Sequence, residues 1–95
     1  MKRLVIAPSA AADLNDIFDY IVRDRPAAAV GLIERLEAAS RLLAEHPGMG
    51  RSRPELGLGI RTYAVERYLI VYRDATDHVL VIRYYHGARN PGRMV

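Results

Sequence analysis

The chain has 95 residues, of which 51% are hydrophobic and 26% charged. That length fits one domain, residues 1–95, with a modest core, and the composition is too apolar for a disordered chain. Because cysteine is absent, a disulfide framework, thiol catalysis and cysteine-ligated zinc are excluded. No apolar run approaches the roughly 20 residues of a membrane span, and no signal-peptide pattern opens the chain. We therefore expect a cytoplasmic protein without membrane contact.

The net charge of +3 is unevenly distributed along the chain. Residues 1–47 carry six cations and seven anions, whereas residues 48–95 carry eight cations and four anions. Thirteen of the fourteen cations are arginine, whose planar guanidinium binds carboxylates or phosphates through paired hydrogen bonds. This bias indicates an anionic partner for the basic half, although an arginine-rich coding preference would give the same composition.

The amino-terminal half predicts a strand followed by two helices. Residues 2–6 are short and β-branched, and they end at Ala7-Pro8-Ser9, where Ala7 or Ser9 caps a helix. Apolar residues then recur at helical spacing, and Pro26 starts a second helix that continues to about Glu45. Only about four residues join the two helices, so they must pack antiparallel as a helical hairpin. The predicted stripes are Leu14, Ile17, Phe18 and Ile21 in the first helix and Ala29, Leu32, Leu36, Ala39 and Leu43 in the second.

The carboxy-terminal half predicts a sheet. His46-Pro47-Gly48-Met49-Gly50 ends the helices, and residues 51–55 form a basic loop. Residues 59–65, 67–73 and 78–86 are rich in Val, Ile and Tyr and predict three antiparallel strands. Strict alternation in the last strand sets Leu80, Ile82, Tyr84 and His86 on one face and Val79, Val81, Arg83 and Tyr85 on the other. The expected fold is α+β, in the order β-α-α-β-β-β, with the helical hairpin on one face of an antiparallel sheet that the first strand joins.

Most catalytic and cofactor chemistries lack the residues they need. Ser9, Ser40 and Ser52 lie in no nucleophile motif. The three histidines, His46, His78 and His86, show no paired metal-ligand spacing, and the glycines match no phosphate-binding loop. We therefore expect no metal, no cofactor and no small-molecule ligand.

One group on the predicted sheet has the residue types for metal-independent RNA cleavage, which needs a base, cations on the phosphate and an acid. Glu66 would be the base, Arg61 and Arg83 the phosphate clamp, and His86 or Tyr85 the acid. The more economical interpretation is a solvated sheet face populated by arginine and tyrosine. The full group comprises Arg51, Arg53, Arg61, Glu66, Arg67, Arg83, Tyr84, Tyr85 and His86.

Three segments of the chain resemble the RelE/ParE family of bacterial toxins. The first is the helix at residues 12–21; the second comprises His46-Pro47-Gly48-Met49-Gly50-Arg51, Pro54-Glu55-Leu56 and Gly59-Ile60-Arg61; the third runs from Tyr68-Leu69-Ile70-Val71-Tyr72-Arg73 to His86-Gly87-Ala88-Arg89-Asn90. The order and spacing of these segments cover nearly the whole chain. The closing His-Gly-Ala-Arg is more similar to the ParE branch than to the RelE branch.

The resemblance implies a type II toxin that is neutralised in a hetero-oligomer by a ParD-like antitoxin, whose helices cover the hairpin and the sheet. ParE-branch toxins inhibit DNA gyrase and are not regarded as enzymes. RelE-branch toxins instead cut messenger RNA on the ribosome, using lysines and arginines. Here Lys2 is the only lysine, so gyrase inhibition is the expected activity and a RelE-like endonuclease is the alternative. A binding module without toxicity is a third interpretation.

An acidic amphipathic helix of the antitoxin would fit a basic surface with aromatic anchors. Arg83 and Arg89 are the expected ion-pair donors, and at least half of the tyrosines are expected to be core residues instead. We assign target binding to His86, Arg89 and Arg93. The predicted antitoxin-binding residues are Tyr20, Tyr63, Tyr68, Tyr72, Arg83 and Tyr85.

Overall fold

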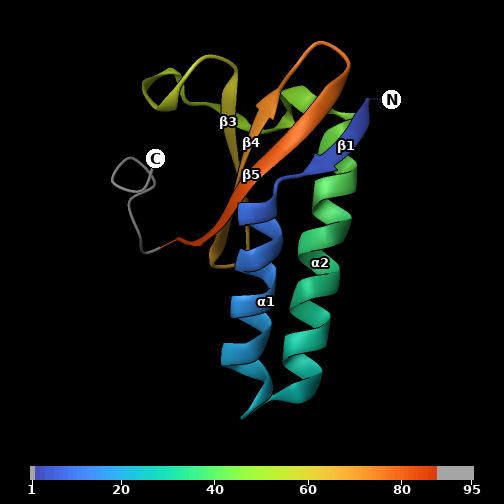
Figure 1. The fold of residues 1–95 in the computed structure, drawn as a ribbon, viewed down its shortest axis with the longest axis vertical. Coiled ribbons are helices and arrows are strands. Elements are labelled where there is room, and N and C mark those ends of the chain that lie inside the picture. The colour runs from blue at the N-terminus through green and yellow to red at the C-terminus, as the bar shows by residue number, and fades with distance from the viewer. Residues whose placement is uncertain (1, 88–95) are drawn as a thin grey trace.

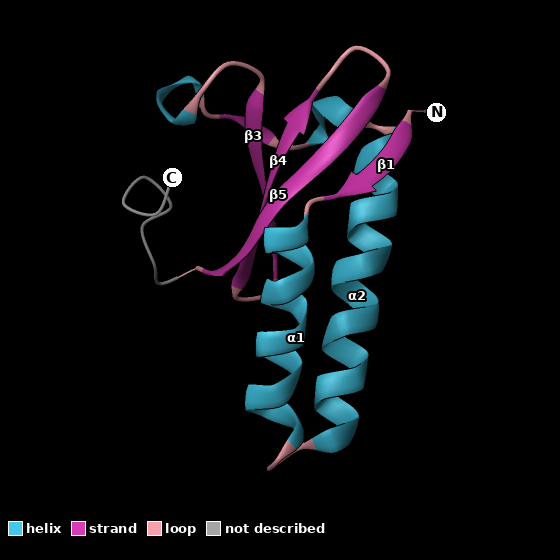
Figure 2. Ribbon diagram, in the orientation of Figure 1, coloured by secondary structure: helices cyan, strands magenta, loops and turns pink. Residues whose placement is uncertain are grey.

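The protein consists of a helical hairpin packed on a five-stranded sheet, as seen in a computed structural model that describes residues 2–87 (Figures 1 and 2). In chain order, β1 spans Arg3–Ile6, α1 spans Pro8–Val22 and α2 spans Pro26–Glu45. The remaining strands are β2 (Arg51–Ser52), β3 (Ile60–Val65), β4 (Tyr68–Asp74) and β5 (His78–His86), with short 3₁₀ turns at Pro47–Met49 and Pro54–Leu56. The α+β class and the helical hairpin predicted from the sequence are confirmed.

Proline sets the start of each helix. Ala7 is the N-cap residue of α1 and Pro8 is its first helical residue, where proline loses no hydrogen bond. Pro26 plays the same part in α2. Ser9, the other predicted cap, lies inside α1, and its hydroxyl donates a hydrogen bond to the carbonyl oxygen of Ile82 at 2.8 Å. The side chain thus binds the sheet instead of capping its own helix.

The sheet is mixed, with the strand order β1-β5-β4-β3-β2. The pairs formed by β2, β3, β4 and β5 are antiparallel, but β1 pairs with β5 in parallel, with Arg3 opposite His78. The prediction of a wholly antiparallel sheet was therefore wrong at this edge. At the opposite edge, Arg51–Ser52 forms a two-residue strand on β3 where the sequence predicted only a loop.

A β-bulge in β5 changes which side chains face the helices. Val71 lies opposite Arg83, but the next residue, Tyr72, lies opposite Val81, so β5 contains one extra residue, Ile82. Tyr84 consequently joins Val79 and Val81 in the core beneath the helices, while Tyr85 joins Ile82 on the other face. The predicted strict alternation was thus wrong beyond Val81.

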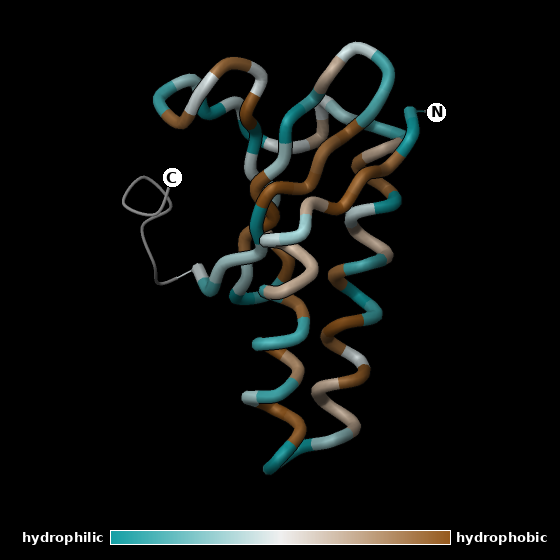
Figure 3. The backbone as a smooth tube through the Cα atoms, viewed as in Figure 1, coloured by the Kyte–Doolittle hydropathy of each residue, from teal (hydrophilic) through white to brown (hydrophobic). Residues whose placement is uncertain are grey.

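The two faces of the sheet contribute unequally to the core. The main cluster lies between the helices and the sheet and includes Leu36, Leu43, Ile70 and Tyr72, each 0% exposed. A smaller cluster of Ile60, Val71 and Tyr85 lies on the opposite face, packed against Leu56 and Ile82. Figure 3 shows the corresponding hydrophobic stretches in the central strands. The hairpin extends past the end of the sheet, so the outer part of α1 has α2 as its neighbour but no strand beneath it (Figure 1).

Candidate interaction groove

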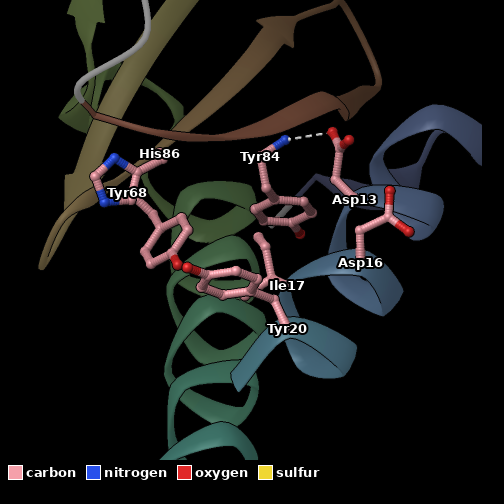
Figure 4. Close-up of a pocket in the computed structure, with 7 residues that line it drawn as sticks. All are labelled: Asp13, Asp16, Ile17, Tyr20, Tyr68, Tyr84 and His86. Atoms are coloured by element: carbon pink, nitrogen blue, oxygen red, sulfur yellow. Dashed lines mark hydrogen bonds between the residues drawn. The ribbon is translucent and has the colours of Figure 1, made fainter. Parts of the chain in front are cut away.

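A groove of about 610 Å³ lies between α1 and the adjoining ends of β4 and β5. The segment of α1 from Asp13 to Tyr20 forms one wall. Tyr68 and His86 form the other wall, and the buried Tyr84 lies at the base (Figure 4). The lining residues are Asp13, Asp16, Ile17, Tyr20, Tyr68, Tyr84 and His86.

The wall contributed by α1 follows from helical spacing. Asp13, Asp16, Ile17 and Tyr20 are separated by three or four residues, so they lie on one face of the helix. Tyr20 is 84% exposed, which is exceptional for so large an aromatic side chain. This face borders the predicted apolar stripe and shares Ile17 with it.

The opposite wall is formed where β4 begins and β5 ends. Tyr68 and His86 are paired across the two strands, and their rings meet edge to face with centroids 5.3 Å apart and an interplanar angle of 83°. Tyr68 is half-buried and packs against the main core, whereas His86 is an exposed residue. Both predicted residues thus border the groove.

Asp13 holds α1 against the bulge in β5. Its carboxylate accepts two hydrogen bonds from the Arg83 guanidinium, at 2.7 and 3.0 Å, and a third from the Tyr84 backbone N–H at 3.0 Å. The pKa of Arg83 is raised, mainly because its guanidinium is hydrogen-bonded to Asp13. One helical turn away, Ser9 binds the carbonyl of Ile82. Together, Ser9 and Asp13 satisfy backbone groups at the irregular point of the strand.

The same contact gives Arg83 a role within the chain. The guanidinium also lies 4.8 Å from the centroid of the Tyr85 ring. Arg83 therefore forms an ion pair and a cation–π contact within the chain, and its predicted ion pair with a partner stays a prediction. Asp13, which lies off the predicted apolar stripe, is the residue that holds the Arg83 guanidinium in this position.

The predicted tyrosine anchors fall into different environments. Tyr72 is 0% exposed and Tyr85 is 1% exposed, so neither side chain is accessible to a partner. The Tyr72 hydroxyl donates to the carbonyl oxygen of Pro47 at 2.7 Å and accepts from the Gly50 N–H at 2.9 Å. Burial raises the pKa of Tyr72. Tyr63 is half-buried against the main core, which leaves Tyr20 and Tyr68 as the predicted anchors that line the groove.

Tyr84, which the sequence grouped with the cleavage residues, is also structural. Ser40 donates to the carbonyl oxygen of Leu36 and lies 2.7 Å from the Tyr84 hydroxyl, so that hydroxyl supplies the proton between them. Burial raises the pKa of Tyr84. The ring therefore forms a fixed apolar base for the groove.

The residues proposed for RNA cleavage are held in separate interactions. Glu66 lies in the turn after β3, at a φ of 54°, and forms an exposed ion pair with Arg35 of α2. Arg61 donates to the carbonyl oxygen of Gly50 at 2.8 Å, near the opposite end of β3. Arg83 is bound to Asp13. The structure therefore does not bring Glu66, Arg61, Arg83 and His86 around one point.

Two of the residues assigned to target binding, Arg89 and Arg93, lie outside the described residues. Within residues 2–87, no group of His, Asp and Glu side chains has the arrangement of a metal site. Neither helix in that range is long and apolar enough to cross a membrane.

The fold and the groove define a small α+β protein in which a helical hairpin covers one sheet face. The family model described as ParE toxin of type II toxin-antitoxin system, parDE, matches residues 4–91. The chain is 34% identical over 91 residues to Toxin ParE1 of Caulobacter vibrioides, an alignment that covers 95% of this chain and 94% of the relative. It is 37% identical over 93 residues to Toxin RelE2 of the same organism, covering 94% and 99% of the two chains.

A solved structure gives the same result. The chain matches a chain of the chromosomal ParDE TA system from P. aeruginosa with a TM-score of 0.78 and 25% identity, over 90% of this chain and 96% of the other. The chain belongs to the ParE toxin family and is a ParE-type toxin of a type II toxin-antitoxin system. The family resemblance carried by the three sequence segments is confirmed.

Proposed function

We propose that this toxin inhibits DNA gyrase by binding it and that a ParD-like antitoxin neutralises it by docking in the groove between α1 and β5. The observation that carries the antitoxin site is the groove itself, which has an apolar and aromatic base and an almost fully exposed tyrosine at its edge. Exposed tyrosines beside a concave surface are typical anchors of protein interfaces. The solved ParDE relative supports a partner of the antitoxin class.

The groove also restricts the chemistry of its occupant. Asp16 is exposed on the α1 wall, and Asp13 forms the adjoining part of that wall. An acidic helix, expected from the net charge of the basic half, would meet these carboxylates unfavourably. We therefore expect the segment that enters the groove to present apolar side chains and a lysine or arginine near Asp16. Acidic residues of the antitoxin would bind arginines elsewhere on the toxin.

A non-enzymatic mode of action is supported by the separation of the residues proposed for cleavage. The guanidinium of Arg83 binds a carboxylate, and Glu66 and Arg61 are engaged at different ends of β3. Identity to a relative named Toxin RelE2 makes ribosome-dependent cleavage of messenger RNA the alternative. That alternative would require these side chains to leave their present partners.

Two assays on the purified toxin distinguish these activities. We expect the toxin to inhibit supercoiling by the gyrase holoenzyme and to increase the amount of cleaved DNA, and we expect addition of the antitoxin to reverse both effects. In parallel, messenger RNA would be incubated with ribosomes and toxin. Uninhibited gyrase together with ribosome-dependent cleavage of the RNA would overturn the proposal in favour of the endonuclease.

A further inference from the structure

The loop between the 3₁₀ turn Pro54–Leu56 and β3 exposes a single leucine. Leu58 is 92% exposed, the highest value among the large hydrophobic residues that the structure describes. Leu56 and Ile60, two residues to either side, instead pack into the smaller apolar cluster. Figure 1 shows that the loop before β3 projects from the body of the protein. Exposure at Leu58 is therefore not shared by its apolar neighbours.

The backbone holds this leucine in place. Gly57 has a φ of 141° and Gly59 a φ of 74°, conformations that favour glycine on both sides of Leu58. The Arg73 Nε donates to the carbonyl oxygen of Leu58 at 3.2 Å, and the Asp74 N–H donates to that of Gly59 at 3.0 Å. A side chain presented by a fixed loop loses little conformational freedom on binding, so it favours tight association.

The charged side chains around Leu58 are mainly basic. Arg73 is exposed and contacts the leucine carbonyl directly. Arg53 donates to the Glu55 carboxylate at 2.7 Å, and both Arg53 and the exposed Arg51 act electrostatically on Glu55, whose pKa Arg53 lowers. With the ion pair between Lys2 and Asp74 included, the charged side chains described near this loop still carry a net positive charge, which is complementary to an apolar pocket with mostly acidic surroundings.

The Leu58 loop is separate from the groove. Arg73, which binds the loop, lies near the end of β4, whereas Tyr68, which lines the groove, begins that strand. Five residues of extended strand span about 17 Å. A segment in the groove and a protein at the loop would therefore contact different ends of the sheet.

We infer that the Leu58 loop is a second docking surface, which inserts Leu58 into an apolar, acid-rimmed pocket on the protein that the toxin targets. The inference rests on the proposed function only in taking that target to be a protein. A nucleic-acid partner is less well matched, because the phosphate backbone offers no apolar pocket for the Leu58 side chain, which is 92% exposed.

The test replaces Leu58 with serine and measures two activities. We expect Leu58→Ser to raise the toxin concentration needed for half-inhibition of gyrase holoenzyme about 30-fold, as for an interface hot spot. Growth arrest on expression without the antitoxin, a readout that assumes no particular target, should weaken in parallel. Antitoxin affinity and the urea concentration at the midpoint of unfolding should stay at the wild-type values because the Leu58 side chain is 92% exposed.

Leu42→Ser is a control for the same substitution outside the loop, because Leu42 lies on α2 and is 39% exposed. This variant should retain wild-type growth arrest. Undiminished growth arrest by Leu58→Ser would overturn the inference whatever the target is. A wild-type toxin that arrests growth without inhibiting gyrase would instead overturn the proposed target, and the loop would still be judged by the growth assay. Weakened binding of Leu58→Ser to a 30-base-pair DNA duplex would favour nucleic acid and also overturn the inference.

Discussion

The tyrosines beneath the helices and those at the groove show how one residue type serves two purposes in this toxin. Tyr72 and Tyr84 are buried, and each hydroxyl has a partner that fixes a neighbouring segment. Tyr20 and Tyr68 form the walls of the groove, where Tyr20 is 84% exposed and Tyr68 is half-buried. The two pairs therefore differ in burial, and only the wall tyrosines are accessible to a partner. Buried tyrosines should therefore determine stability, and groove tyrosines should determine binding.

The largest expected effect is on stability, from Tyr72→Phe. This substitution leaves the buried Gly50 N–H and the Pro47 carbonyl without their hydroxyl partner. We expect the free energy of unfolding, measured by urea titration, to fall by about 2–3 kcal/mol. Antitoxin affinity measured well below the unfolding midpoint should change little. A stability equal to that of the wild type would show that the hydroxyl does not anchor the segment after α2.

Tyr20→Ala should have a smaller effect, and on binding instead. Loss of an exposed aromatic anchor is expected to weaken antitoxin binding about 30-fold by titration calorimetry, or about 2 kcal/mol. The free energy of unfolding should remain within about 0.5 kcal/mol of the wild type, as is usual at exposed positions. Asp19→Asn, at the neighbouring exposed residue that does not line the groove, is the control and should bind normally. Equal affinities for Tyr20→Ala and the wild type would place the antitoxin elsewhere.

The smallest expected effect comes from Tyr85→Phe. The Tyr85 hydroxyl is buried and has no hydrogen-bond partner among the described residues, so its removal eliminates a desolvated polar group without leaving another one unpaired. We expect the free energy of unfolding to stay equal or to rise by up to about 1 kcal/mol. A loss as large as that of Tyr72→Phe would remove the distinction between hydroxyls that hold the fold and hydroxyls that do not.

The local parts of the fold could be predicted from the sequence. The spacing of Leu14, Ile17 and Ile21 and the positions of Pro8 and Pro26 were sufficient for the helical hairpin. A two-residue strand such as Arg51–Ser52 is too short to show an alternating pattern, so β2 was missed. The parallel pairing of β1 depends on contacts with a distant strand and leaves no local signal.

The site was less predictable because it depends on the bulge. The segment from Val79 to Tyr85 reads as an unbroken strand, and nothing in it marks Ile82 as the extra residue. The carboxylate that binds Arg83 comes from Asp13, seventy residues earlier. One signal was available, because the spacing of Asp13, Asp16 and Tyr20 places two carboxylates and an aromatic ring on the same face of a helix. That face would have directed attention to α1.

The pairing of β1 with β5 also constrains how the toxin folds during its synthesis. The helical hairpin is stabilised by contacts between neighbouring segments and can form early, but Arg3 must wait for His78 to emerge from the ribosome before its strand has a neighbour. Tyr68 and His86 are translated after Tyr20, so the groove is assembled only when β5 is in place. A nascent chain therefore acquires this binding surface only after β5 has been translated and has paired with β1 and β4.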